Sequence, residues 1–90
     1  ALQEVDNAMT HYHHATTQVE AVQKAFEQAQ ITNKLAIDLY KKGLTDFQNV
    51  LDAQRSLLQY EDDLVEAKSS VSLALVQLYR ALGGEWNNEQ

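Results

Sequence analysis

Three histidines near the start of the chain have the side chains best suited to binding a metal ion. They are His11, His13 and His14, and positions 11 and 14 would share one face of a helix. Imidazole binds zinc, copper or nickel, but two histidines make only half of a tetrahedral site, and the chain has no cysteine. Glu4 or Asp6 could add a ligand only by bending round. The sequence therefore favours a polar surface or a helix-packing role over a native metal site.

Acidic residues gather further along the chain, where paired carboxylates could perform acid-base chemistry or bind calcium. The cluster is Glu61, Asp62, Asp63 and Glu66. Consecutive side chains on a helix point in different directions, so positions 61, 62 and 63 cannot converge on one ion. We therefore expect a solvated helix face. Because the sequence contains no nucleophile-base pairing, phosphate-binding glycine loop or metal-ligand motif, we expect neither an enzyme nor a cofactor.

An acid and a base, Asp52 and Arg55, form a third candidate. They are three residues apart and so share one helical face. The simplest interpretation is a solvated ion pair within one helix, which would contribute only about 0.3 kcal/mol to stability. Any larger role depends on the elements that position the pair.

The overall charge narrows the possible partners. The chain of 90 residues has 7 Lys and Arg residues against 13 Asp and Glu residues, a formal net charge of −6. Nucleic-acid binding needs clustered basic residues, whereas the basic residues of this chain are scattered. The same scatter argues against a basic helix that lies on a membrane surface. The longest apolar run, residues 73–76, is far shorter than the roughly 20 residues that span a bilayer. A protein partner is the expected alternative.

Glycine and proline divide the chain into its elements. Gly43 is the only glycine before residue 83 and there is no proline, so two long segments should meet at Gly43. In both segments the larger apolar residues recur mostly three, four or seven positions apart, which is typical of amphipathic helices. The predicted fold class is all-α, a long antiparallel two-helix coiled-coil hairpin. This single hairpin, 1–90, would consist of a helix over about 2–42, a turn at 43–45, a helix over about 46–82 and a short tail at 83–90.

The residues beside Gly43 predict how the first helix ends. Lys41 and Lys42 put positive charge at the negative end of the helix dipole. Gly43 suits the left-handed position just beyond the last turn, and Leu44 could then fold back on Leu39. The sequence therefore predicts a tight, well-specified turn.

The second helix has its own start signal and a broad apolar surface. Thr45 and Gln48 fit the S/T-x-x-E/Q capping box, and Asp46 adds negative charge to the first turn. Between residues 71 and 82 only three positions are clearly polar, so one partner helix would leave apolar surface exposed to water. Gly83 is expected to end this helix as Gly43 ends the first.

Three blocks of sequence carry a more specific signal. They are a Tyr-x-x-Gly turn at 40–43, a Leu-Asp-Ala-Gln-Arg-Ser-Leu run at 51–57 and a Leu-Tyr-x-Ala-Leu-Gly-Gly-x-Trp ending at 78–86. In order and spacing they resemble the outer-membrane factor family, the TolC-like channels of tripartite efflux systems. Residues 1–5 also look like the start of the last long helical stretch in these channels. The resemblance covers nearly the whole chain.

The resemblance implies a fold context, a location and partners. Such channels are trimers that place a β-barrel in the outer membrane of Gram-negative bacteria and a helical α-barrel in the periplasm. The chain would be the final periplasmic hairpin of one subunit. Its partners would be neighbouring channel subunits, a periplasmic adaptor protein and an inner-membrane pump, and the isolated hairpin would self-associate into a helical bundle.

The resemblance also assigns roles to residues near the turn. Gly43, Leu44 and Thr45 would form the tip that docks the adaptor, whereas the alternative is that they only cap two helices. Asn49, Asp52 and Arg55 would belong to the periplasmic gate. Asn49 stands where some members carry an acid, which would weaken an acidic ring at the pore. A second departure, Glu85 in place of a usual third glycine, could alter the exit from the second helix.

The sequence leaves two other functions open for the chain. The first is the coiled-coil hairpin of a periplasmic efflux adaptor, which is also long and helical but would carry a different tip and lack the Leu-Gly-Gly-x-Trp ending. The second is a generic structural helical bundle, formed when αα-hairpins dimerise.

Overall fold

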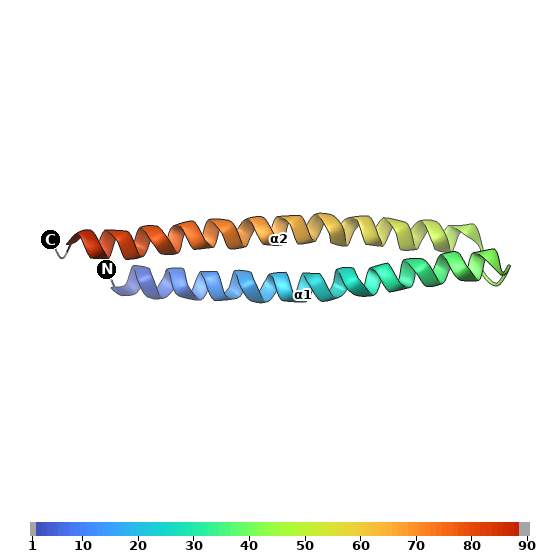
Figure 1. Cartoon of the computed structure of the whole chain (residues 1–90), viewed down its shortest axis with the longest axis horizontal. Helices are drawn as coiled ribbons and strands as arrows, with labels where there is room; N and C mark the ends of the chain where they lie inside the picture. The colour runs from blue at the N-terminus through green and yellow to red at the C-terminus, as the bar shows by residue number, and fades with distance from the viewer. Residues whose placement is uncertain (1, 89–90) are drawn as a thin grey trace. The chain divides into compact units, whose positions relative to one another are not determined.

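Two long helices account for most of the chain. The computed structural model describes residues 2–88, with side-chain environments for residues 3–83. Helix α1 runs over Leu2–Lys41 and helix α2 over Phe47–Asn88 (Figure 1). Among the described residues there is no strand. The predicted all-α, two-helix fold is therefore confirmed.

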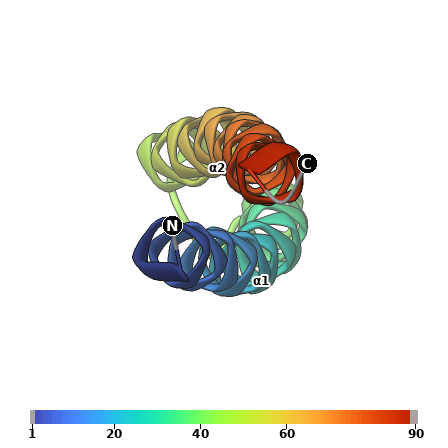
Figure 2. The same cartoon turned by 90° about the vertical axis from the view of Figure 1, so that its left-hand side faces the viewer.

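The chain divides into two compact units, each containing part of both helices. The turn unit is Ala21–Val65, and the terminal unit combines Ala1–Glu20 with Glu66–Gln90. Within each unit the α1 and α2 segments run antiparallel and side by side, as both views show (Figures 1 and 2).

A seven-residue repeat on each helix produces the buried seam of each unit. Every buried side chain among residues 3–83 belongs to these repeats, and the other members are half-buried apart from Tyr60. This is the pattern of a coiled coil, in which one narrow stripe per helix faces the partner helix. On α1 the two rows are 5, 12, 19, 26, 33 and 8, 15, 22, 29, 36, and on α2 they are 50, 57, 64, 71, 78 and 53, 60, 67, 74, 81.

The rows differ in side-chain size, which explains how closely the helices pack. On α2 one row is Val or Leu throughout, whereas the other is alanine at every position except Tyr60. Alanine at these positions lets the helix backbones approach, and Ala74 in the terminal unit is 0% exposed. No larger side chain among the described residues is fully buried. Two helices therefore shield one stripe but cannot build a deep core.

The second helix does not end where the sequence predicted. It continues to Asn88, so residues 83–88 of the expected tail are helical, and residues 89–90 lie outside the described part. Among the described residues only Gly43 has a positive φ, so Gly83 stays in the helix. A glycine costs about 1 kcal/mol in a helix interior relative to alanine, which weakens the helix without stopping it. The other ends, at Lys41 and Phe47, differ from the predicted ones by one residue.

Candidate functional site at the turn

Backbone hydrogen bonds close the end of α1 at Gly43. The Gly43 N–H donates to the Tyr40 carbonyl and the Leu44 N–H donates to the Leu39 carbonyl, both at 2.9 Å. This pair of bonds is the Schellman arrangement, which requires a left-handed residue, and Gly43 has φ +73°. A Cβ built on Gly43 would meet no atom within 4 Å, so the backbone angle and not crowding requires glycine. The predicted left-handed glycine is confirmed.

Leu44, at the apex of the turn, is mostly exposed. The sequence led us to expect an apolar contact between Leu44 and Leu39, but the bond to Leu39 is made by the Leu44 backbone N–H, and the Leu44 side chain is 70% exposed. The Tyr40 and Phe47 rings pack at 5.3 Å between centroids with an interplanar angle of 57°, and this contact joins the end of α1 to the start of α2. Reasoning from the sequence missed this aromatic pair. Its only signal was one aromatic residue on each side of the glycine turn.

Asp46, and not Thr45, caps the start of α2. Its Oδ1 accepts a hydrogen bond from the backbone N–H of Asn49 at 3.1 Å. The predicted capping box between Thr45 and Gln48 is therefore wrong, because Gln48 Nε2 donates to Asp52 Oδ1 at 3.0 Å instead. Since α2 begins at Phe47, Asp46 occupies the cap position, where a carboxylate also interacts favourably with the helix dipole.

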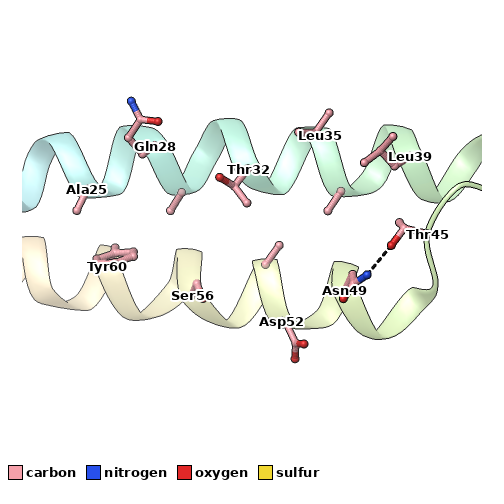
Figure 3. A pocket seen from close by; sticks show the side chains of 13 residues that line it. Ala25, Gln28, Thr32, Leu35, Leu39, Thr45, Asn49, Asp52, Ser56 and Tyr60 are labelled. Carbon is pink, nitrogen blue, oxygen red and sulfur yellow. Dashed lines mark hydrogen bonds between the residues drawn. The ribbon is translucent and has the colours of Figure 1, made fainter.

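Thr45 is held by another residue of the expected site. Its Oγ1 accepts a hydrogen bond from Asn49 Nδ2, and this bond is drawn in Figure 3. Asn49 therefore contacts both residues that precede α2, through its backbone to Asp46 and through its side chain to Thr45. This explains structurally why an amide at position 49 suits the turn.

A groove of about 590 Å³ starts beside the turn and follows the two helices within the turn unit. Small residues line much of it, namely Ala25, Ala29, Ala36 and Ala53, with Thr45, Asn49 and Asp52 at the turn end. The Asp52 carboxylate itself points away from α1 (Figure 3).

The expected ion pair between Asp52 and Arg55 is not formed. Asp52 accepts its hydrogen bond from Gln48, and among the described residues no ion pair joins Asp52 to Arg55. Both side chains are exposed on the outer surface of α2. The structure thus brings together Gly43, Leu44, Thr45 and Asn49 at the turn, while Asp52 and Arg55 lie further along α2 without contacting each other.

The histidines lie on the exposed surface of α1. The rings of His13 and His14 meet edge-on at 6.4 Å, and the His13 carbonyl accepts hydrogen bonds from the Thr16 and Thr17 hydroxyls at 2.9 Å. His11 lines a groove that also contains Glu4 and Arg80, so the one acidic side chain there is accompanied by a positive charge. Among residues 3–83, whose side chains the structure describes, no group of three His, Cys, Asp or Glu side chains is arranged to hold a metal ion.

The acidic cluster does not converge. Glu61, Asp62 and Glu66 are exposed, and Asp63 is half-buried with its Oδ1 accepting a hydrogen bond from Gln59 Nε2 at 3.0 Å. The expectation of a largely solvated face is confirmed for the three exposed acids.

Large apolar side chains remain exposed on α2 in the turn unit. They form the outer stripe, which consists of Leu51, Leu58 and Val65 at seven-residue intervals, each one position after a member of the buried seam. Leu58 is 61% exposed and Val65 is 63% exposed. The sequence predicted uncovered apolar surface between residues 71 and 82, and in the terminal unit Leu73, Val76 and Tyr79 are indeed 63%, 46% and 69% exposed. The outer stripe in the turn unit was not predicted.

Comparison with known proteins gives a consistent result. The family model described as "Outer membrane efflux protein" matches residues 1–84. The chain is 34% identical to the cation efflux system protein CusC of Escherichia coli O6:H1 over 86 residues, which are 96% of the chain and 19% of that relative. It is 43% identical to the pyoverdine export outer membrane protein OpmQ of Pseudomonas putida over 60 residues, which are 67% of the chain and 13% of that relative.

A third relative is named for another transported compound. The toluene efflux pump outer membrane protein TtgF of Pseudomonas putida is 32% identical over 71 residues, which are 79% of the chain and 15% of that relative. The chain thus spans no more than about a fifth of the length of the relatives it matches. No solved structure matches it significantly.

These matches decide between the readings left open by the sequence. They favour the channel family over a periplasmic adaptor or a generic bundle. The expected location, the outer membrane of a Gram-negative bacterium, agrees with the names of the relatives. In the described part of the chain, neither helix is apolar enough over a sufficient length to cross a membrane.

Proposed function

Because this chain belongs to the outer membrane efflux protein family, we propose that it forms a helical hairpin in the periplasmic wall of a trimeric efflux channel. The family match over residues 1–84 is the observation that carries the proposal, since it includes both helices and the turn. The outer stripe supports it, because exposed apolar residues at helical spacing need neighbouring helices to cover them. Neighbouring helices of the homotrimer would provide that cover.

The proposed role of the turn is to dock the periplasmic adaptor that connects the channel to an inner-membrane pump. Gly43, Leu44 and Thr45 would form the contact. Leu44 offers exposed apolar area, and the open space at the Gly43 Cα would allow close approach of a partner backbone. The capped helix ends make the turn rigid before binding, which limits the entropy lost on docking.

Substitution of Leu44 tests the docking role. In the full-length channel protein, Leu44→Ser should weaken adaptor binding by about tenfold, the loss of roughly 1.4 kcal/mol expected for an apolar contact residue. The control is Leu73→Ser, at a leucine of similar exposure in the terminal unit, 63% against 70% for Leu44. Adaptor affinity measured by biolayer interferometry should fall only for Leu44→Ser, and unchanged affinity would contradict the docking role.

The proposed role of Asn49, Asp52 and Arg55 is to hold the resting channel shut. Asp52 and Arg55 do not pair with each other, and both are exposed, so each charge is available to a group on a neighbouring helix. Pairs between helices would then hold the closed state, and breaking them would let the helices slide apart. The Asn49 side chain donates a hydrogen bond to Thr45, so Asn49 would contribute to the closed state by fixing the shape of the turn.

Single-channel recording tests the gate. In the full-length protein, Asp52→Ala and Arg55→Ala should each raise conductance in planar bilayers, because either change removes one partner of a closing contact. Asp62→Ala, which removes another exposed acid of α2, is the control and should leave conductance unchanged. If the two gate variants conduct like the wild type, the gating role is wrong.

The hairpin's proposed work does not depend on the transported compound. The names of the relatives mention cations, pyoverdine and toluene, yet each matches this hairpin. A shared hairpin in channels with different named cargoes fits a mechanical role in docking and opening.

A further inference from the structure

The rows that form the buried seam fall into two classes of side-chain size. The alanine rows, 8, 15, 22, 29, 36 on α1 and 53, 60, 67, 74, 81 on α2, are alanine apart from Val22 and Tyr60. The large rows, 5, 12, 19, 26, 33 on α1 and 50, 57, 64, 71, 78 on α2, are Val, Leu, Tyr or Phe apart from Asn33. None of these exceptions falls in the terminal unit, so there the difference is complete.

The alanine rows of the two helices lie on the same side of the seam in each unit. In the turn unit Ala36 of α1 and Ala53 of α2 line the groove of about 590 Å³. In the terminal unit Ala8 of α1 and Ala81 of α2 line a groove of about 600 Å³. We call this side of each unit the alanine face.

The alanine face is rich in small or uncharged polar side chains. In the turn unit it includes Thr32 of α1 and Ser56 of α2, which are both exposed and line the groove (Figure 3). Leu35 and Tyr60 are the exposed exceptions there. In the terminal unit the groove residues other than alanine are all polar, namely Glu4, Asn7, His11, Gln77 and Arg80. The face is therefore suited to contact with water.

The opposite face of the turn unit, on the side of the large rows, is lined by bulkier side chains. Its groove of about 410 Å³ contains Asn33 and Leu57 of the large rows, with Gln30 and Ile31 beside them. The Asn33 Oδ1 is inaccessible to solvent and has no hydrogen-bond partner among the described residues, so it offers this face no acceptor. The two faces thus differ in side-chain size on both helices.

A closed ring of helices packed side by side needs such a difference. Side chains that face the bore lie nearer the axis of the ring, so they have less room than those that face outward. The separation of two helices depends on the side chains at their contact, and protein interiors are close-packed. Small residues are therefore needed on the inner side of each contact and larger residues on the outer side.

We infer that the alanine face lines the water-filled bore of the channel, and that Thr32 and Ser56 are bore-lining residues. The inference rests on the proposed function and adds which side of the hairpin meets the transported solute. Hydroxyl and amide groups on this face would bind passing hydrated solutes weakly, as conduction requires. The opposite face would then lie on the outside of the wall.

Two matched pairs of cysteine substitutions in the assembled full-length protein test the inference. Thr32→Cys and Ser56→Cys lie on the alanine face. Their controls are Gln30→Cys and Gln54→Cys, because two residues correspond to about 200° around a helix. All four native side chains are exposed in the hairpin.

Each variant is made in a background without other cysteines and treated with a short poly(ethylene glycol) maleimide. Mass spectrometry measures the labelling, and planar bilayers measure the conductance. Treated Thr32→Cys and Ser56→Cys should conduct at least about twofold less than the untreated variants, because the polymer occupies the bore. Treated Gln30→Cys and Gln54→Cys should conduct as before.

The inference would be overturned if the two Gln variants lost conductance instead, or if all four variants responded alike. Failure of Thr32→Cys and Ser56→Cys to be labelled would also overturn it, since a neighbouring helix would then cover the alanine face. If the untreated wild-type protein formed no conducting pore, the proposed channel function would be wrong. The two failures are therefore distinguishable.

Discussion

The turn and the outer stripe of α2 lie in the same unit, but the hairpin supplies hydrogen-bond partners for the turn and leaves the apolar side chains of the stripe exposed. At the turn, named hydrogen bonds occupy the backbone groups on both sides of Gly43. On the outer stripe, Leu58 and Val65 remain mostly exposed although they repeat at coiled-coil spacing. The turn is thus complete within the hairpin, whereas the stripe is complete only with a neighbour. Substitutions should therefore affect hairpin folding at the turn and assembly at the stripe.

The largest effect is expected on the stripe. In the full-length protein, Leu58→Asp should destabilise the trimer by about 2 kcal/mol or more per interface, because a carboxylate would be buried without a partner. In the 90-residue chain the same change should alter the free energy of unfolding by less than about 0.5 kcal/mol, since position 58 is exposed there. Native mass spectrometry and urea unfolding measure the two quantities.

Ser69→Asp provides the control for this prediction, because it adds the same charge at an exposed position of α2 outside the stripe. It should leave the trimer intact. Equal loss of trimer in both variants would mean that added charge, and not the position of Leu58, disrupts assembly.

The next largest effect is on the free energy of unfolding, where the same substitution at two glycines should have opposite results because their backbone angles differ. Gly43→Ala should lower the free energy of unfolding of the 90-residue chain by about 1–2 kcal/mol, because a left-handed conformation is unfavourable for alanine. Gly83→Ala should raise it by up to about 1 kcal/mol, because Gly83 is inside α2. A Cβ at either glycine would meet no atom within 4 Å, so crowding does not contribute.

Opposite signs in urea unfolding are the expected result for the two glycines. If Gly83→Ala also destabilised the chain, α2 would end near Leu82, as the sequence first suggested.

The smallest effect concerns the cap of α2. Asp46→Ala should cost about 1 kcal/mol of unfolding free energy, because it removes the acceptor for the Asn49 N–H. Thr45→Ala should cost less, about 0.5 kcal/mol, because it removes one exposed side-chain hydrogen bond. Thermal unfolding of the two variants ranks them, and a larger loss for Thr45→Ala would restore the capping box that the structure replaces.

The glycine turn could be predicted from the sequence, and the ends of α2 could not. Gly43 was identifiable because it is the only glycine before residue 83 in a chain without proline, and basic residues and a helix-start signal flank it. The start of α2 was ambiguous because Thr45 and Asp46 can both cap a helix. Which of them is the cap depends on which residue is the first to adopt helical backbone angles. Its end was misplaced because glycine also fits an α-helix, and the sequence alone does not distinguish the two conformations.

The candidate site was only partly predictable for a related reason. Spacing placed Asp52 and Arg55 on one face, but it could not show that Gln48 would occupy the Asp52 carboxylate. Asn33 was missed because the search for periodicity counted apolar residues. Its signal was present in the seven-residue row of Tyr12, Val19 and Phe26, where position 33 is the polar member.

The most direct test of the hairpin as part of a larger channel wall is thiol labelling of Leu58→Cys, with Leu44→Cys as the reference. Both side chains are exposed in the hairpin, and the chain has no cysteine of its own. In the assembled full-length protein without adaptor, Leu58→Cys should react at least about tenfold more slowly than in the 90-residue chain at a concentration low enough to keep it monomeric, whereas Leu44→Cys should react equally fast in both. If Leu58→Cys is labelled as fast in the assembled protein as in the isolated chain, the outer stripe is not covered and the proposed wall is wrong.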